Sequence, residues 1–255
     1  MDPLLDFTNH TVLITGAASG FGRLLAIGLA NRGANLVLGD IDESGLAETV
    51  KQLNISDDRV VTMKNDVSSE AECAAMVKAA VDTFGKLDSA VNNAGVAHDP
   101  AATHELTEAI LDRQIDINVK GVMFGMKYQI QAMLANGKGH ILNVSSMAGL
   151  GGAPKGGAYV AAKHAVAGLT RTAAVEYGRL NVRCNAICPF FSPTNILNVD
   201  GFNSEKDRAR MAMGSPMKRL GDPQEMVNVM LMMLSPGNTY MNGQTIAVDG
   251  GVSAW

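Results

Sequence analysis

Seven short apolar segments alternate with helix-like segments along the whole chain, and this alternation constrains the fold more than any other feature. The strand-like segments are TVLIT from Thr11, NLVLGD from Asn35, RVVTMKND from Arg59, LDSAVNN from Leu87, GHILNVSS from Gly139, NVRCNAIC from Asn181 and QTIAVD from Gln244. Several are short and β-branched, as expected for strands covered on both faces. Helical periodicity lies between them, over 20–32, 43–53, 69–84, 104–135 (which a break could divide), 158–178 and 222–235. The pattern predicts an α/β fold: a doubly wound (Rossmann) domain with a seven-stranded parallel sheet and helices on both faces.

The segment 189–221 interrupts this regular alternation. It is long, contains three prolines and includes a short helical patch. A long irregular segment in a compact domain is typical of a lid or a binding loop. Because no linker, repeat or low-complexity tract is present, we predict a single domain over 1–255 with a substrate lid over about 189–221.

Composition excludes several classes of protein. Hydrophobic residues make up 47% of the chain and charged residues 18%, which allows a sizeable core. The net charge of −4 argues against nucleic acid or an anionic membrane as the main partner. No apolar run has the length of a membrane span, and MDPLLDFTNH lacks the basic start and apolar core of a signal peptide, so we expect a cytoplasmic protein. Cys73, Cys184 and Cys188 match no zinc pattern; we expect structural thiols and no metal site.

A glycine-rich segment, TGAASGFG, follows the first strand-like segment and opens the first helix. Glycines let the backbone turn tightly and approach a ligand, and a helix N-terminus offers free N–H groups to a pyrophosphate. A doubly wound sheet binds dinucleotides at this position. The spacing departs from GxGxxG, so the segment alone also fits an ordinary glycine-rich turn. The candidate cofactor-binding residues here are Gly16, Ser19, Gly20, Phe21 and Gly22.

Asp40 ends the second strand-like segment. An acidic side chain there can accept hydrogen bonds from adenosine ribose hydroxyls and would repel a 2′-phosphate. No basic residue replaces it locally, because Ile41 follows it and the glycine-rich segment carries Ser19. We therefore predict NAD(H) rather than NADP(H) as the cofactor. Arg23, at the start of the first helix, is expected to be a surface residue rather than a phosphate ligand.

Tyr159 and Lys163 stand four residues apart in a helix-like segment, so they share one face of that helix. A free phenol has a pKa of about 10 and is a poor acid or base near neutral pH. A nearby positive charge favours the phenolate and lowers that pKa toward the working range. Most pairs at this spacing are a half-buried ring beside a solvated amine, so the pair gains chemical meaning only from the residues around it.

Several motifs occur together in this chain: TGAASGFG, NNAG at 92–95, Asn118, Ser146 and YVAAK. In combination they resemble the short-chain dehydrogenase/reductase family. The resemblance covers nearly the whole chain, from Thr11 to the VDGG that ends at Gly251, and the combination is far more specific than any one motif.

The resemblance implies four catalytic residues. The Tyr and Lys of the family's YxxxK map to Tyr159 and Lys163, the catalytic Ser maps to Ser146 in preference to Ser145, and the family Asn maps to Asn118 in INVKG. Tyr159 would exchange a proton with the substrate oxygen, and Ser146 would hold that oxygen. Lys163 would lower the pKa of the phenol and bind the nicotinamide ribose. Asn118 would position a water that relays protons toward Lys163.

The resemblance also implies cofactor contacts along the chain. It assigns Asp66 and Val67 to the adenine, the backbone of Asn92, Asn93, Ala94 and Gly95 to the central adenosine and ribose region, Tyr159 and Lys163 to the nicotinamide ribose, and Pro189 and Thr194 to the nicotinamide.

One position departs from the family's pattern. Phe190 stands where a Gly usually follows Pro189, and Phe191 comes next. We expect the two rings to alter the path of the loop or to fill part of the substrate cavity. With Ile196 and Leu197 they give the lid an apolar character, which favours an apolar or aromatic substrate.

These features predict an NAD-dependent oxidoreductase that transfers a hydride between the nicotinamide and a secondary alcohol or ketone. Two alternatives on the same scaffold are a 3-oxoacyl reductase and a hydroxysteroid dehydrogenase. An alternative from another class is a nucleotide-binding regulator that has lost catalysis, which the intact set of four catalytic residues disfavours. The resemblance implies a homotetramer.

Overall fold

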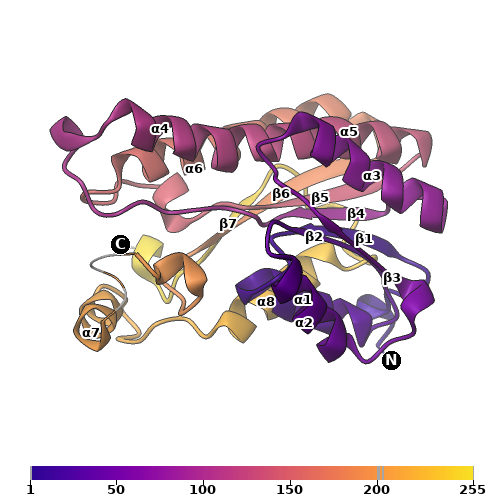
Figure 1. Cartoon of the computed structure of the whole chain (residues 1–255), viewed down its shortest axis with the longest axis horizontal. Coiled ribbons are helices and arrows are strands. Elements are labelled where there is room, and N and C mark those ends of the chain that lie inside the picture. Colours follow the sequence, from indigo (N-terminus) through magenta and orange to yellow (C-terminus); the bar gives the residue numbers. More distant parts are fainter. Residues whose placement is uncertain (1, 200–201, 203, 255) are drawn as a thin grey trace.

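The computed structural model describes residues 2–199, 202 and 204–254, and its centre is one parallel sheet. The strand order is β3-β2-β1-β4-β5-β6-β7, which confirms the predicted doubly wound α/β fold (Figure 1). The strands are β1 (Thr11–Thr15), β2 (Asn35–Asp40), β3 (Val60–Lys64), β4 (Ser89–Asn92), β5 (Gly139–Val144), β6 (Val182–Pro189) and β7 (Thr245–Val248).

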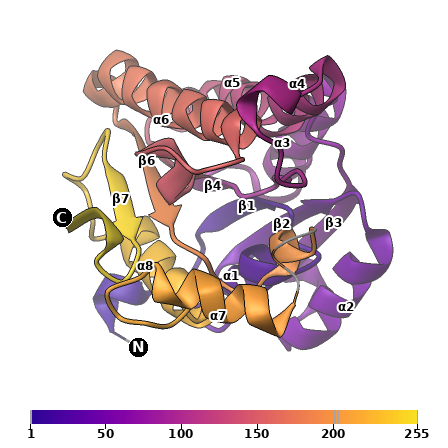
Figure 2. The same ribbon diagram turned by 90° about the vertical axis from the view of Figure 1, so that its left-hand side faces the viewer.

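Helices cover both faces of the sheet. They are α1 (Gly20–Ala30), α2 (Glu43–Leu53), α3 (Glu70–Phe84), α4 (Glu108–Gln114), α5 (Gly121–Ala135), α6 (Gly157–Tyr177), α7 (Glu205–Met213) and α8 (Pro223–Leu234). One layer contains α3, α4, α5 and α6, and the opposite layer contains α1, α2, α7 and α8 (Figures 1 and 2). The helix α7 belongs to the predicted lid, whose residues 200, 201 and 203 lie outside the described part of the chain.

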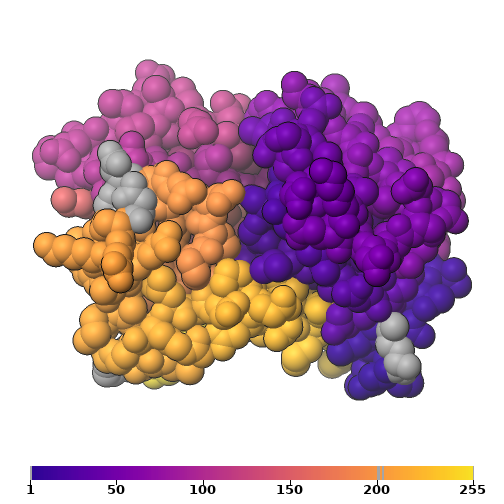
Figure 3. Space-filling model, turned by 60° about the horizontal axis from the view of Figure 1, so that its bottom comes forward, coloured from indigo at the N-terminus to yellow at the C-terminus, as the bar shows by residue number. Residues whose placement is uncertain are grey.

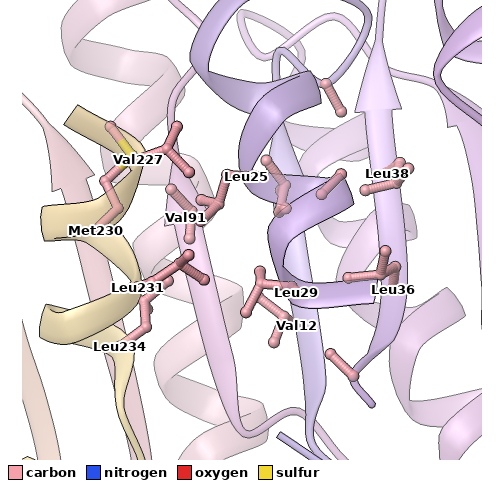
Figure 4. Packing of buried hydrophobic residues seen from close by; sticks show 14 of the residues in the cluster. Val12, Leu25, Leu29, Leu36, Leu38, Val91, Val227, Met230, Leu231 and Leu234 are labelled. Atoms are coloured by element: carbon pink, nitrogen blue, oxygen red, sulfur yellow. The ribbon is translucent and has the colours of Figure 1, made fainter. Parts of the chain in front are cut away.

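The two layers bury separate apolar cores. On one face, Leu25 and Leu29 of α1 and Leu231 of α8 pack against Val12 and Val91 of the sheet, all at most 3% exposed (Figure 4). On the other face, the strands pack against α3, α5 and α6. The strands are therefore covered on both sides, as their continuous apolar runs predict.

The strand order reverses direction between β1 and β4. From β1 the chain builds outward through β2 to β3, then returns to β4 and builds outward to β7 on the other side. In such a sheet, ligands bind beyond the carboxyl ends of the strands where the order reverses. The glycine-rich turn after β1 and the NNAG segment after β4 both lie at this place.

The long helical segment predicted over 104–135 is divided. A short 3₁₀ turn, Thr103–Glu105, precedes α4, and a π-helical stretch, Ile115–Lys120, joins α4 to α5. A π-helical stretch inside an α-helix is rare and frequently marks a functional site. Here it contains Asn118, a candidate catalytic residue.

Four buried polar side chains join the sheet to α5 and α6. Asn92 of β4 exchanges hydrogen bonds of 3.1 and 2.8 Å with Gln129 of α5 and donates to Asn143 of β5 at 2.8 Å. Asn143 donates in turn to Thr170 of α6 at 2.9 Å. None of the four is more than 3% exposed. The network adds directional bonds to apolar packing at the helices that carry the candidate catalytic residues.

The helices of the described ranges fall short of the combined length and apolar character that a membrane-spanning helix needs. Over the same ranges, no three His, Cys, Asp or Glu side chains lie together in a way that could hold a metal ion. Cys73, Cys184 and Cys188 are buried and unbridged, as expected for structural thiols.

Replacing Asn143 by Ala should destabilise the protein, because the change opens a cavity and removes the bonds to Asn92 and Thr170. We expect the free energy of unfolding, measured by urea denaturation, to fall by about 3 kcal/mol. Asn136→Ala is the control, since the Asn136 side chain bonds the Lys138 carbonyl near the surface; its effect should stay within about 0.5 kcal/mol. Equal stability of the two variants would contradict the role of the network.

Candidate active site

The glycine-rich turn is compact because of its glycines. Gly16 and Gly20 have φ angles of +67° and +53°, a region that L side chains rarely adopt. A Cβ at Gly16 would lie 2.8 Å from Nδ2 of Asn93, and a Cβ at Gly22 would collide with the Gly16 carbonyl oxygen. Each glycine is therefore required by backbone conformation or by close approach.

The NNAG segment is bound directly to this turn. Asn93 donates through Nδ2 to the Thr15 carbonyl at 2.9 Å, and the backbone N–H groups of Asn93 and Ala94 donate to the Thr15 hydroxyl, each at 3.1 Å. The Asn92 side chain points into the core network instead. These contacts occupy the amide side chains and the N–H groups of Asn93 and Ala94, so a cofactor contact from this segment would have to use its other backbone groups.

Asp40 lies at the end of β2 beside the turn. Its carboxylate accepts hydrogen bonds from the backbone N–H groups of Ala18 at 2.9 Å and Asp42 at 3.0 Å. Asp66 lies beyond the neighbouring strand β3, where one of its oxygens accepts two hydrogen bonds from Ser68. Val67 is 7% exposed. Both predicted adenosine contacts, Asp40 and the pair 66–67, are therefore at the same edge of the sheet.

The start of α1 offers backbone donors to an anion. Five other helices have an N-cap side chain that accepts a hydrogen bond from the first turn, whereas within the described chain the Ser19 side chain makes no such bond to α1. The first N–H groups of a helix have no partner inside the helix and suit a phosphate. Together with the compact turn and Asp40, this arrangement fits a dinucleotide.

The helix α6 presents Tyr159 and Lys163 to the end of β5. Lys163 is 3% exposed, and its Nζ donates to the Val144 carbonyl at 2.9 Å. The same Nζ lies 5.5 Å from the centre of the Tyr159 ring. A Cβ placed on Gly95 would lie 3.4 Å from it, so the amine also reaches the NNAG segment. Lys163 therefore connects the phenol, β5 and the loop after β4.

Burial changes the ionisation of both members of the pair. Desolvation raises the pKa of Tyr159 to about 12, and a hydrogen bond with Ser146 opposes this in part. Desolvation also lowers the pKa of Lys163 from 10.5 to about 8. The Tyr159 pKa thus stands above its ordinary value, opposite to the lowering predicted from Lys163, because loss of hydration is the largest effect on it.

The structure distinguishes the two serines at the end of β5. Ser146 is half-buried, accepts a hydrogen bond from the Ala148 N–H at 3.1 Å and is hydrogen-bonded to Tyr159. Ser145 is buried, and its hydroxyl donates to the Lys163 backbone carbonyl at 3.0 Å. Ser146 is therefore the serine beside the phenol, and Ser145 holds α6 against β5.

The Asn118 side chain is fully engaged with its neighbours. It accepts from the Val96 N–H at 3.0 Å and donates to the Val96 carbonyl at 2.9 Å and to Gln114 Oε1 at 2.7 Å. Asn118 thus fixes the loop beside Lys163, and a water relay would have to use its backbone. Gln114, which is 1% exposed, was not predicted from the sequence; its spacing of four from Asn118 in a helical segment is the signal that could have identified it.

Pro189 and Thr194 lie where β6 leads into the lid. Pro189 pairs with Val248 at the end of the sheet, and a Cβ at Gly20 would lie 3.3 Å from the Cβ of Thr194. The lid therefore contacts the glycine-rich turn, and Figure 3 shows the orange lid residues beside the indigo N-terminal residues.

The two aromatic rings after Pro189 pack within the lid. The ring centres of Phe190 and Phe191 are 4.8 Å apart, and those of Phe191 and Phe202 are 5.6 Å apart. Phe190 also lines a cavity of about 150 Å³ with apolar and charged side chains, among them Met217 and Arg219. The rings join β6 to the lid, and Leu197 is buried while Ile196 is half-buried.

Arg23 is not the surface residue that the sequence predicts. It is half-buried at the start of α1, and its guanidinium donates to Thr49 Oγ1 at 3.0 Å, to the Gly45 carbonyl at 3.2 Å and to the Ala18 carbonyl. No local sequence signal predicts this contact, because it depends on α2 packing against α1.

Comparison with known proteins places this site in a wide group of relatives. A family model described as enoyl-(acyl carrier protein) reductase matches residues 16–253. Levodione reductase from Leifsonia aquatica is 38% identical over 259 residues, which cover 99% of this chain and 97% of the relative. Cyclohexanol dehydrogenase from an Acinetobacter species is 36% identical over 244 residues, which cover 96% and 95%.

Solved structures share the fold over nearly the whole chain. The crystal structure of levodione reductase has a TM-score of 0.93 at 38% identity and covers 97% of this chain and 99% of that one. Carveol dehydrogenase from Mycobacterium avium, in complex with NAD, has a TM-score of 0.90 at 30% identity with coverage of 97% and 99%. ElxO with NADP bound has a TM-score of 0.89 at 27% identity with coverage of 96% and 99%.

Replacing Lys163 by Met should stabilise the protein at neutral pH. Below pH 8 the lysine is charged in the folded and the unfolded chain, so the folded state bears the full desolvation cost. Between pH 8 and pH 10.5 only the unfolded chain holds the proton, and this group therefore makes stability rise with pH. The variant should be more stable at pH 7, by on the order of 3 kcal/mol, and this gain should shrink toward pH 10.

Thermal and urea unfolding from pH 7 to pH 10, without added cofactor, measure this difference. Lys120→Met is the control, because Lys120 is exposed and paired with Asp116; it should show no gain at any pH. A Lys163→Met variant less stable than the parent at pH 7 would contradict the desolvation cost.

Proposed function

Because the chain belongs to the short-chain dehydrogenase/reductase family, whose relatives here are oxidoreductases of alcohols and ketones, we propose that it is an NAD-dependent dehydrogenase of cyclic secondary alcohols. The observation that carries the proposal is the meeting of Ser146, Tyr159 and Lys163 at the end of β5. Lys163 of this group reaches Gly95, and the neighbouring Asn93 is bonded to the turn that fits a dinucleotide. A nucleotide-binding regulator would have no use for a buried lysine beside a phenol.

The chemistry divides between the cofactor and the chain. A bound nicotinamide would supply or accept the hydride. Tyr159 exchanges the proton with the substrate oxygen, and the Ser146 hydroxyl holds that oxygen beside the phenol. Lys163, protonated below about pH 8, favours the phenolate and binds the nicotinamide ribose. Asn118 bonds the backbone of Val96 and so fixes the loop after β4 beside Lys163.

The preference for NAD(H) rests on the surroundings of the adenosine ribose. Asp40 is the acidic group at the end of β2, and its carboxylate would repel a 2′-phosphate. Arg23, the nearest cation on the turn, is occupied by the carbonyl groups of Ala18 and Gly45. A 2′-phosphate would therefore meet a carboxylate beside a guanidinium that already bonds Thr49 and two carbonyl groups.

The substrate class rests on the lid and on the relatives. The lid carries apolar and aromatic side chains, among them Phe191, Ile196 and Leu197. One relative is named for cyclohexanol, a compact ring alcohol of this character. A 3-oxoacyl thioester or a steroid is larger than the ring alcohol we propose. The homotetramer stays a prediction from the resemblance, and the cytoplasmic location stays a prediction from the sequence.

A panel of alcohols and ketones with both cofactors tests the proposal. We expect kcat/KM to be highest for a six-membered ring alcohol with NAD and for its ketone with NADH. Linear secondary alcohols, a hydroxysteroid and a 3-oxoacyl thioester should follow, and NADP(H) should give at least a tenfold lower value in each case. Preference for NADPH would contradict the role of Asp40, and turnover of the thioester alone would favour a 3-oxoacyl reductase.

Tyr159→Phe should remove turnover and leave cofactor binding intact. Loss of the proton-transfer group should lower kcat by about 10²–10⁴-fold, while the Kd for NADH, measured by fluorescence titration, should stay within about twofold. Tyr128→Phe is the control, because the Tyr128 hydroxyl bonds Glu70 and joins α5 to α3. Wild-type turnover in the Tyr159 variant would show that the proton passes through another group.

A further inference from the structure

Arg23 and Thr49 form a side-chain pair between α1 and α2. Arg23 Nε donates to the Thr49 hydroxyl at 3.0 Å, and one of the Arg23 terminal nitrogens donates to the carbonyl groups of Ala18 and, at 3.2 Å, Gly45. Thr49 has no exposed surface, and its hydroxyl donates to the Ala17 carbonyl at 2.9 Å, with the Gly45 carbonyl at 3.0 Å. One guanidinium and one hydroxyl thus hold two consecutive carbonyls of the glycine-rich turn.

The pair works because α2 lies close to the turn. A Cβ placed on Gly45 would lie 2.7 Å from the Cβ of Ala18, so only glycine allows this distance without a shift. From the other side, Asp40 accepts the Ala18 N–H at 2.9 Å. Ala17 and Ala18 are buried. Thr49 of α2 holds the Ala17 carbonyl, Arg23 of α1 holds the Ala18 carbonyl, and Asp40 of β2 holds the Ala18 N–H.

The residues that follow Ala18 begin the N-terminal end of α1. Their N–H groups are the ones that a pyrophosphate would use, and the Ser19 side chain makes no capping bond there within the described chain. Each peptide unit is planar, so the direction of the Ala18 carbonyl also sets the direction of the Ser19 N–H in the same unit. Holding the carbonyls of Ala17 and Ala18 therefore orients the peptide groups that follow them. An error in this orientation would misdirect every donor that meets the phosphates.

We propose that Arg23 and Thr49 are positioning residues of the cofactor site, which set the glycine-rich turn in the shape that binds the pyrophosphate. The inference rests on the proposed use of a nicotinamide dinucleotide and adds two residues to that site. Arg23 acts through the geometry of its fork of donors and not as a charge on the ligand, since those donors are directed at the Thr49 hydroxyl and at two protein carbonyls.

Four variants separate geometry from charge. Arg23→Met removes both, Arg23→Lys keeps the charge without the fork, Thr49→Val keeps the shape without the hydroxyl, and Thr49→Ser restores the hydroxyl.

The Kd for NADH, measured by isothermal titration calorimetry, should rise about tenfold in the first three variants, the change expected for losing one hydrogen bond to a charged group. Thr49→Ser should stay within about threefold. The kcat at saturating NADH should be unchanged throughout, and Arg23→Met combined with Thr49→Val should be no weaker than either change alone.

Arg32→Met is the matched control. Arg32 bonds the Gly28 carbonyl at 2.8 Å near the other end of α1, so its loss should leave the Kd for NADH unchanged. Unfolding temperatures of all variants are compared, and where Arg23→Met does not fold, Thr49→Val and Thr49→Ser decide the matter.

Three results would overturn the proposal. If Arg23→Lys binds NADH with wild-type affinity, only the charge of Arg23 matters. If an Arg23 variant loses more affinity for NADPH than for NADH, Arg23 is a phosphate ligand. If Thr49→Val binds NADH with wild-type affinity, the bond between Arg23 and Thr49 has no role in cofactor binding. If only the proposed dehydrogenase function is wrong, the parent protein binds NADH but turns over no alcohol or ketone. The NADH affinities of the variants can then still be compared. A parent that binds no NADH overturns both.

Discussion

The close approach between the turn after β1 and the loop after β4 is the constraint on which the site depends. These two segments belong to neighbouring strands where the order of the sheet reverses, and Asn93 binds them together through the backbone of Thr15 and Gly16. No side chain fits between them, because a Cβ at Gly16 would contact Asn93 and Ala94. The same approach places the start of α1 beside the loop that Asn118 holds against Lys163. The candidate cofactor-binding and proton-transfer residues are thus placed by one packing arrangement.

The buried lysine introduces a conflict between stability and chemistry. Removing an amine from water lowers its pKa to about 8, and the same dry surroundings raise the pKa of Tyr159 to about 12. A folded protein would be more stable with an apolar side chain at Lys163. The fold compensates elsewhere: the network through Asn143 and Thr170 ties α6 to the sheet, and Ser145 bonds the carbonyl of Lys163 itself. The helix can therefore carry an unfavourable side chain in a fixed position.

Much of this arrangement is predictable from the sequence. Short β-branched runs predicted the strands, because strands buried on both faces leave a continuous apolar signal, and the caps at Ser69 and Asp222 open α3 and α8. The motifs around Ser146 and Tyr159 predicted two residues that the structure brings together. Tertiary contacts were not predictable: Arg23 bonds α2 across the turn, and the π-helical stretch around Asn118 follows from its bonds to Val96 and Gln114. Local patterns report burial and capping, whereas these contacts depend on which elements become neighbours.

The aromatic pair after Pro189 shows how one departure from a family's pattern can act at a distance. A glycine after Pro189 would leave the start of the lid free to move over the cofactor. Phe190 and Phe191 instead add a ring contact to each other, and Phe191 adds one to Phe202. They reinforce a main-chain bond that glycine could also make, from the N–H of residue 190 to the Val248 carbonyl at 3.1 Å. The lid is therefore anchored to the sheet at its first residues, while Thr194 still reaches Gly20. An anchored start limits the range of positions that the rest of the lid can adopt.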